Sequence, residues 1–196
     1  QDMNSAEIIT IGDELLIGQT VDTNSAWMGM QLSMRGIQVN RIVSISDRRE
    51  EIIAALDESL RRVPLVLITG GLGPTSDDIT KETLAEYFGT KLVMSQEVLD
   101  EVTNRITRRN LEMNENNRRQ AMVPESCRVL ANHAGTAPAM LFEKEGRIIV
   151  SMPGVPSEMK HIMHEHVLPM ISSMTGKKKK KLLFIIFYIF FWFHKT

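Results

Sequence analysis

Residues 65–69 form an apolar run, Leu-Val-Leu-Ile-Thr, that leads directly into the glycine-rich stretch 70–80. A short apolar run bounded by turn residues is typical of a strand buried on both faces of an α/β protein. Glycines after such a strand let the backbone approach an anion, and the N-terminus of a following helix adds a partial positive charge. We therefore expect a buried strand, a phosphate-binding loop and a helix in that order.

Two adjacent acids, Asp77 and Asp78, end this loop. Carboxylates beside a bound phosphate would repel it unless a divalent cation lay between them. The pair therefore indicates metal-assisted chemistry on a phosphate ester. A purely structural interpretation stays open, because glycine-rich sequences also form plain tight turns and either aspartate could cap the following helix.

The order of the other elements predicts a parallel sheet covered by helices. Apolar and alternating segments predict strands at residues 7–11 and 37–45 before the strand at 65–69, with an amphipathic helix in each interval. We expect Asn24 or Ser25 to cap the first helix and a capping box at residues 47–50 to begin the second.

The second half of the chain predicts a less regular arrangement. Its expected elements are a helix at residues 80–88, a short strand at 92–94, a helix at 96–109, a connection at 110–117, a hairpin formed by 139–144 and 147–152, and a final helix after Pro153. The expected fold class is α/β, with three α/β/α layers, a mostly parallel sheet and a small hairpin.

Ligands of open α/β sheets bind at the carboxyl ends of the strands. Three predicted loops lie there, at residues 12–22, 70–80 and 153–158. If their strands are neighbours, five acids crowd one rim, and a metal ion would make that tolerable: Asp13, Glu14, Asp22, Asp77 and Asp78. The alternatives are that Asp13 and Glu14 are solvated and that Asp22 caps a turn. The candidate phosphate- and ligand-binding residues are Gly70, Gly71, Gly73, Pro74, Thr75, Thr80, Pro153, Gly154 and Glu158.

Three histidines near the C-terminus, His161, His164 and His166, invite a metal interpretation. We expect His161 and His164 to share a helix face, but their order matches no zinc-protease spacing, and histidines near a helix C-terminus also favour the helix dipole. We therefore favour a structural role for them. The single cysteine, Cys127, lacks a catalytic pattern and is expected to be a packed thiol.

Charge and cysteine content exclude several classes of protein. Six lysines in the last 20 residues raise the formal net charge; without them it falls from -1 to -7. An acidic body is a poor binder of nucleic acid, so we expect no such partner. One cysteine excludes an internal disulfide and fits a reducing compartment, and the first apolar run is interrupted by Glu7 and does not resemble a secretory signal. We expect a cytoplasmic protein.

The C-terminal segment differs in composition from the rest. Five lysines at 177–181 precede an apolar run at 182–193. A basic-flanked membrane anchor is one interpretation, but the run is shorter than the roughly 20 residues of a spanning helix. The other is a slipped reading frame, because every residue type from 177 to 191 can be encoded with A and T alone. We favour the second, with a domain at residues 3–172 and a non-native tail at 173–196.

Six sequence blocks in the order of the chain resemble the N-terminal domain of the competence/damage-inducible protein A (CinA) family, which has the molybdopterin-binding fold of molybdenum-cofactor biosynthesis proteins. They are Gly-Asp-Glu-Leu-Leu at 12–16, Gly-Gln-Thr-Val-Asp-Thr-Asn-Ser at 18–25, Gly-Gly-Leu-Gly-Pro-Thr with Asp-Asp-Ile-Thr within 70–80, Asn-Arg-Arg-Gln-Ala at 117–121, Gly-Thr-Ala-Pro at 135–138 and Pro-Gly-Val-Pro-Ser-Glu-Met at 153–159.

The resemblance implies more than the residues do by themselves. It implies metal-dependent ADP-ribose pyrophosphatase activity, a homodimer, and active-site positions for Asp22, Asp77 and Asp78, which we expect to be catalytic. From the clustered acids we expect a divalent ion, Mg²⁺ or Co²⁺, with Asp13, Asp22 and Asp78 as its ligands. The alternative is a binding or assembly domain for molybdopterin or a nucleotide. Family members usually carry a C-terminal nicotinamide mononucleotide deamidase domain, which this sequence does not include, so we expect no deamidase activity. The family pattern commonly has glycine where this chain has Ala139.

Overall fold

The computed structural model describes residues 3–72 and 79–175. Its centre is a six-stranded sheet in the order β2-β1-β3-β8-β7-β6. The strands are β1 (Ser5–Ile11), β2 (Gln38–Ile45), β3 (Leu65–Gly70), β6 (Arg128–Leu130), β7 (Ala139–Lys144) and β8 (Arg147–Met152). The first four strands of that order pair in parallel, whereas β7 and β6 add in antiparallel fashion. The predicted hairpin is β7 and β8, and it belongs to this main sheet.

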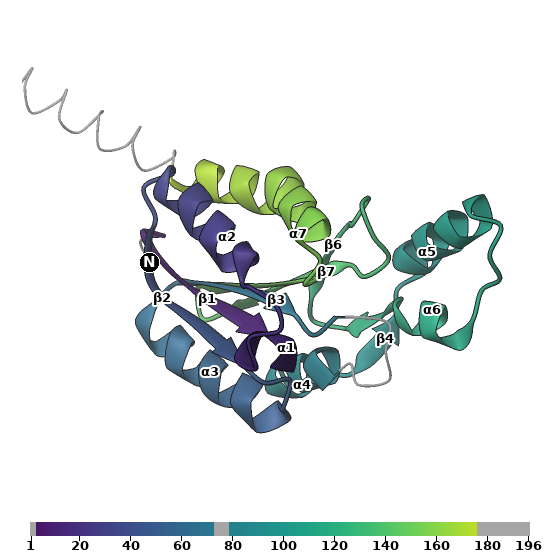
Figure 1. The fold of residues 1–196 in the computed structure, drawn as a ribbon, viewed down its shortest axis with the longest axis horizontal. Coiled ribbons are helices and arrows are strands. Elements are labelled where there is room, and N and C mark those ends of the chain that lie inside the picture. Colours follow the sequence, from purple (N-terminus) through teal and green to yellow (C-terminus); the bar gives the residue numbers. More distant parts are fainter. Residues whose placement is uncertain (1–2, 73–78, 176–196) are drawn as a thin grey trace, which may run out of the picture.

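Helices cover both faces of the sheet, which confirms the predicted three-layer α/β/α fold (Figure 1). One face carries α2 (Thr23–Ser33) and the C-terminal helix, in which α7 (Pro156–Ile162) runs into the π-helix η1 (Met163–Val167). The other face carries α3 (Arg49–Arg62) and α4 (Ile79–Tyr87).

The central strands are mostly apolar because both of their faces are covered. In β1, Ile8 packs with the α2–α7 layer and its neighbour Ile9 packs with the α3–α4 layer. In β3, Leu67 packs with the α2–α7 layer and Ile68 packs with the α3–α4 layer. Side chains alternate between the two faces of a strand, so one continuous apolar run supplies two cores.

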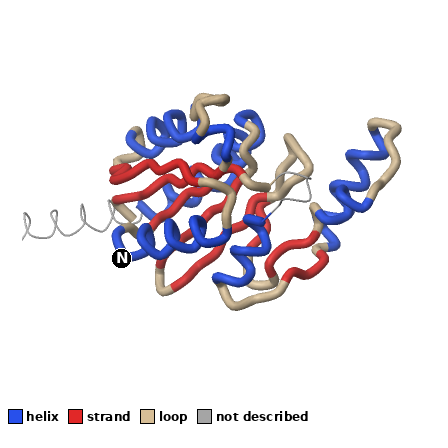
Figure 2. The backbone as a smooth tube through the Cα atoms, turned by 60° about the horizontal axis from the view of Figure 1, so that its bottom comes forward, coloured by secondary structure: helices blue, strands red, loops and turns tan. Residues whose placement is uncertain are grey.

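A smaller part stands to one side of the main sheet; we call it the α5–α6 lobe, residues 92–124 (Figure 2). It contains α5 (Gln96–Arg108), α6 (Glu115–Arg119) and an antiparallel pair, β4 (Leu92–Met94) and β5 (Met122–Pro124). Its own small core is formed by Val98, Val102, Ile106 and Ala121. The predicted connection at 110–117 thus includes the first residues of α6.

Two predicted helix starts are wrong. Asp22, rather than Asn24 or Ser25, is the N-cap of α2. The predicted capping box fails because α3 has Arg48 as its N-cap, without a capping side chain, so Asp47 lies one residue too early. Residues 13–16, expected as a turn and loop, form the one-turn helix α1 (Asp13–Leu16).

Within the described residues, no helix is both long and apolar enough to cross a membrane. Residues 173–175 are the end of the C-terminal helix, so the segment predicted as a tail starts inside it. The lysine run and the apolar run after it lie outside the described residues.

Candidate functional site

A pocket of about 320 Å³ lies at the carboxyl ends of β1, β3 and β8. We call it the carboxyl-end pocket. In the sheet, β2 lies on one side of β1 and β3 lies on the other. The strand order therefore reverses at β1, and the pocket lies at this point. Open α/β sheets bind ligands at this position. The pocket is lined by Thr10, Ile11, Glu14, Leu15, Thr20, Val21, Asp22, Thr23, Asn24, Thr69, Gly70, Gly71, Leu72, Gly154, Val155 and Pro156.

Gly70 is the last residue of β3, Gly71 follows it, and both line the carboxyl-end pocket. Both have positive φ angles, 106° and 66°. A Cβ at Gly70 would collide with the carbonyl oxygen of Ile11, and one at Gly71 would collide with the hydroxyl of Thr80. The backbone at Gly70 and Gly71 therefore lies close against β1 and α4, and this packing alone requires glycine at both positions.

Asn24 connects two strand ends beneath the pocket. Its Nδ2 donates to the carbonyl oxygen of Gly154 at 2.8 Å and to Oγ1 of Thr69 at 3.2 Å. The Thr69 hydroxyl donates in turn to the carbonyl oxygen of Pro153 at 2.9 Å. Because both hydrogens of the Asn24 amide are used, its orientation is fixed and Oδ1 is left as a pure acceptor. We call Asn24, Thr69, Pro153 and Gly154 the carboxyl-end network.

This network is incomplete. Asn24 is buried, with 8% of its surface exposed, and its Oδ1 has no hydrogen-bond partner in the described structure. A buried acceptor without a partner costs about 1–3 kcal/mol, so such atoms are rare and commonly mark a bound water or ligand. Asn24 is a lining residue of the pocket, and its buried Oδ1 is left without a partner among the described residues.

Two of the predicted acids face the pocket and one does not. Asp22 lines it and also caps α2: its Oδ1 accepts from the Ser25 amide at 3.0 Å and its Oδ2 from the Ser25 hydroxyl at 2.5 Å. Glu14 lines the pocket as well, with its carboxylate beside Gly12. Asp13 is exposed and is not a lining residue.

Three predicted ligand-binding residues lie around the pocket and not in its lining. Thr80 is fully buried beneath Gly71, and its hydroxyl has no partner among the described residues. Pro153 contributes its carbonyl to the carboxyl-end network. Glu158 accepts from Nδ2 of Asn132 at 2.6 Å and thereby holds the loop at residues 132–137.

The remaining predicted site residues, Gly73, Pro74, Thr75, Asp77 and Asp78, lie outside the described residues. Across residues 3–72 and 79–175, no three His, Cys, Asp or Glu side chains come together as a metal site. The predicted assignment of Asp13, Asp22 and Asp78 as metal ligands stays a prediction.

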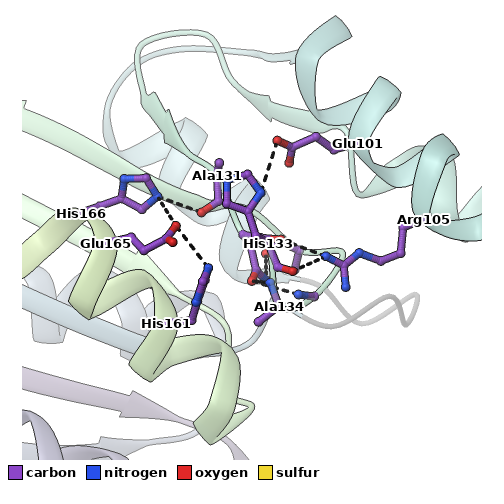
Figure 3. Close-up of polar contacts among 11 residues, drawn as sticks. Glu101, Arg105, Ala131, His133, Ala134, His161, Glu165 and His166 are labelled. Carbon is purple, nitrogen blue, oxygen red and sulfur yellow. Dashed lines mark hydrogen bonds and ion pairs between the residues drawn. The ribbon is translucent and has the colours of Figure 1, made fainter.

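The histidines serve as contacts between elements (Figure 3). His161 lies 3.2 Å from Glu165, and His166 Nε2 lies 3.0 Å from the carbonyl oxygen of Ala131. His164 packs edge-on against Trp27 of α2, with ring centroids 5.2 Å apart. His161 also lies beside the His133 ring, with ring centroids 6.0 Å apart, so the rings of His161 and His164 face different neighbours and the expectation that they share a face is wrong. The helix changes to π geometry at Met163, between the two residues, which alters the α-helical spacing.

Cys127 is half-buried and packs against the α3–α4 side of the core. Burial raises the pKa of its thiol to about 11. A thiol with so high a pKa stays protonated near neutral pH, where the thiolate is the nucleophilic form. The geometry agrees with the predicted packed thiol.

The sequence interpretation missed Asn24 and Thr69 as site residues. The local sequence predicts Asn24 only as a helix cap and Thr69 only as the end of the central strand. The available signal was the Thr-Asn-Ser block at residues 23–25 directly after the first loop, together with a hydroxyl at the very end of a buried strand.

Comparisons with known proteins agree with this geometry. A family model described as a probable molybdopterin binding domain matches residues 7–173. A CinA-like protein of Cytophaga hutchinsonii is 49% identical over 160 residues, which are 82% of this chain and 38% of that protein. A CinA-like protein of Gemmatimonas aurantiaca is 44% identical over 173 residues, covering 87% of this chain and 40% of that protein. The chain thus spans about two fifths of the length of these relatives.

Solved structures give the same result. The crystal structure of the protein CinA from Thermoplasma acidophilum is 34% identical, with a TM-score of 0.76, and the match covers 84% of this chain and 96% of that one. The tungsten cofactor synthesizing protein MoaB from Pyrococcus furiosus is 19% identical, with a TM-score of 0.56 and coverage of 89% and 99%, which shows a shared fold. The chain belongs to the CinA-like members of the molybdopterin-binding domain family.

Proposed function

We propose that the carboxyl-end pocket binds a nucleoside diphosphate-linked sugar such as ADP-ribose and hydrolyses its diphosphate with the help of a divalent ion. The observation that carries the proposal is the position of the pocket: it lies where the strand order reverses, and one of its lining residues, Asn24, has a buried acceptor, Oδ1, that is unpaired within the described residues. Its volume of about 320 Å³ is within the range of small-ligand sites.

Four lining residues of the pocket have distinct parts in this proposal. The turn at Gly70 and Gly71 brings bare backbone to the pocket floor, where a diphosphate can approach closely. Asn24 Oδ1 cannot pair with phosphate oxygens, because both are acceptors, so it would receive a hydroxyl or N–H of the ligand. Asp22, held at the start of α2, supplies a fixed negative charge.

The described residues do not by themselves form a site for Mg²⁺ or Co²⁺. Both oxygens of Asp22 already accept hydrogen bonds from Ser25, and Asp13 is outside the pocket lining. A bound divalent ion would supply charge neutralisation and a water of lowered pKa. The ion and its ligands are part of the proposal.

The test compares two aspartates that differ in position. Asp22→Asn keeps an N-cap, since Asn caps as well as Asp, but removes the charge from the pocket. We expect it to lower Mg²⁺- or Co²⁺-dependent release of AMP from ADP-ribose by about 100-fold. Asp100→Asn makes the same chemical change at an exposed residue of α5, outside the pocket, and should leave the rate unchanged. Full activity in Asp22→Asn would refute the role of Asp22.

The second candidate is a module that binds molybdopterin or a nucleotide without turnover. It is favoured by the family itself, which is described as molybdopterin-binding. Calorimetry with ADP-ribose and with molybdopterin, with and without the divalent ion, separates the candidates. A pure binding module gives a saturable heat signal for its ligand while no AMP is formed.

We also propose a homodimer, as the family resemblance implies. Apolar side chains at the rim of the carboxyl-end pocket are exposed, with Ile17 at 74% and Val21 at 79%. Such side chains are suited to be covered by a second copy or by a ligand. Light scattering at several protein concentrations measures the mass directly, and a monomer throughout would refute the dimer.

A further inference from the structure

A second cavity, of about 470 Å³, lies away from the carboxyl-end pocket and shares no lining residue with it. We call it the arginine cavity. It is bounded by α5 and by the segment that contains His133, and its lining residues are Glu101, Asn104, Arg105, Arg108, Arg109 and His133. Neither the family match nor the proposed function gives this cavity a role.

One flank of α5 supplies most of the lining. Glu101, Arg105 and Arg108 follow one another at spacings of four and three residues, so they lie along one side of the helix. This side is next to the buried stripe of Val98, Val102 and Ile106. The arginines therefore stand at the edge of the lobe's core, beside the segment at residues 131–134.

Hydrogen bonds hold that segment in place across the cavity (Figure 3). Arg105 Nη2 donates to the carbonyl oxygen of His133 at 2.6 Å, and His133 Nδ1 lies 3.9 Å from Glu101 Oε1. From the other side, His166 contacts the carbonyl oxygen of Ala131. Both walls of the cavity are thus fixed by contacts that leave Arg108 and Arg109 unused.

The charge of the cavity is unbalanced. Within the described residues, the Arg108 and Arg109 side chains form no hydrogen bond or ion pair, while the single lining acid, Glu101, is the one next to His133. The helix dipole favours basic residues in the last turn of α5, but it accounts equally for Arg61 in the last turn of α3, which does not line the arginine cavity. Two free guanidinium groups in a concave surface attract anions.

From these observations we propose that the arginine cavity is a second binding site, which takes a small ligand bearing a diphosphate or two neighbouring phosphates. The phosphates contact Arg108 and Arg109, because Glu101 at the other end repels them. Guanidinium groups match phosphate oxygens in geometry as well as in charge.

The test is a titration of the whole chain with inorganic pyrophosphate, followed by NMR at low ionic strength. We expect saturable shifts of the Nε–Hε signals of Arg105, Arg108 and Arg109. The double variant Arg108→Gln/Arg109→Gln should raise the dissociation constant by about tenfold or more, equivalent to about 1.4 kcal/mol. The matched control Arg61→Gln also removes a last-turn arginine and should change the constant less than about twofold.

Each outcome of the titration either supports or overturns the arginine cavity as a phosphate-binding site. Absence of saturable shifts at the three arginines overturns the proposal, and so does an equal loss of affinity in Arg61→Gln, which would show a general charge effect. The backbone signals of Gly70 and Gly71 report the carboxyl-end pocket in the same spectra. AMP release from ADP-ribose is measured in a separate assay. Saturation of the arginine signals by pyrophosphate, together with no AMP release from ADP-ribose, would support the arginine cavity and refute the proposed hydrolysis, and the opposite pattern would do the reverse.

Discussion

Two buried polar networks lie at opposite ends of the parallel sheet, and they differ in completeness. At the amino end, Glu7 of β1 is 1% exposed and receives hydrogen bonds from Arg62 at 2.7 and 2.9 Å and from the Ser59 hydroxyl at 2.8 Å. We call these three residues the amino-end network. At the carboxyl end, the network of Asn24 and Thr69 leaves one buried acceptor unpaired.

The difference indicates that the amino end of the sheet serves stability and that the carboxyl end serves binding. A buried charge with a full set of partners is tolerated and fixes the packing of α3 on β1. A buried acceptor without a partner costs stability, and a ligand that supplies the missing donor recovers that cost. Changes at the amino end should therefore alter stability alone, whereas changes at the carboxyl end should alter both stability and binding.

The largest effect is expected from Arg62→Leu. It leaves the Glu7 carboxylate buried with only the Ser59 hydroxyl, and we expect the free energy of unfolding to fall by about 3 kcal/mol in urea denaturation. Affinity for ADP-ribose should not change. Arg61→Leu is the matched control, because it alters an exposed arginine of the same helix turn and should cost less than about 0.5 kcal/mol. Equal losses in the two variants would contradict the closed network.

Glu7→Gln tests the same network through pH. Burial alone would raise the pKa of Glu7, but hydrogen bonds from Arg62 and Ser59 outweigh it and hold the pKa below its usual value. A carboxyl group with a lowered folded-state pKa adds stability above its unfolded pKa, about 4.3, and loses it as the pH falls through the folded value. The free energy of unfolding of the wild type should exceed that of Glu7→Gln by about 2 kcal/mol at pH 7. This difference should shrink below about pH 4. A gap that is constant with pH would contradict this account.

The sequence predicted the fold well because the fold depends on local patterns. The apolar run at 65–69 fits only a strand covered on both faces, and β3 is buried along its whole length. The wrong predictions were also local. The N-cap of α3 is Arg48, one residue after the Asp47 that the capping box predicts, and the sequence does not reveal this shift. The antiparallel addition of β6 to the sheet depends on pairing with β7, which no local pattern specifies.

The amino-end and carboxyl-end networks could not be predicted from the sequence, for a different reason. Glu7 appeared only as an interruption of an apolar run, since its partner Arg62 is 55 residues away. Asn24 appeared only as a cap, since its partners are 45 and 130 residues away. Side chains whose roles depend on contacts between distant segments can be identified only after the strands have been placed.

Thr69→Val tests the carboxyl end with almost no change in volume. It removes one acceptor from Asn24 Nδ2 and the donor to the Pro153 carbonyl, so we expect a loss of about 1.5 kcal/mol in the free energy of unfolding. Unlike Arg62→Leu, it should also weaken ADP-ribose binding, measured by calorimetry. Thr69→Ser keeps the hydroxyl and should retain binding. If Thr69→Val lost stability but bound normally, the two ends of the sheet would not differ as proposed.

The smallest change in stability concerns Asp22, which is both a cap and a pocket residue. Asp22→Ala removes the hydrogen bonds to the Ser25 amide and hydroxyl and should lower the free energy of unfolding by about 1 kcal/mol, whereas Asp22→Asn should lower it by only a few tenths. Thermal unfolding and AMP release are measured on both variants. We expect the two to differ in stability but to lose activity alike, because each lacks the charge. If activity instead followed stability, with Asp22→Asn active and Asp22→Ala impaired, Asp22 would act only as the cap of α2, and the carboxyl-end pocket would have to obtain its catalytic charge from other residues.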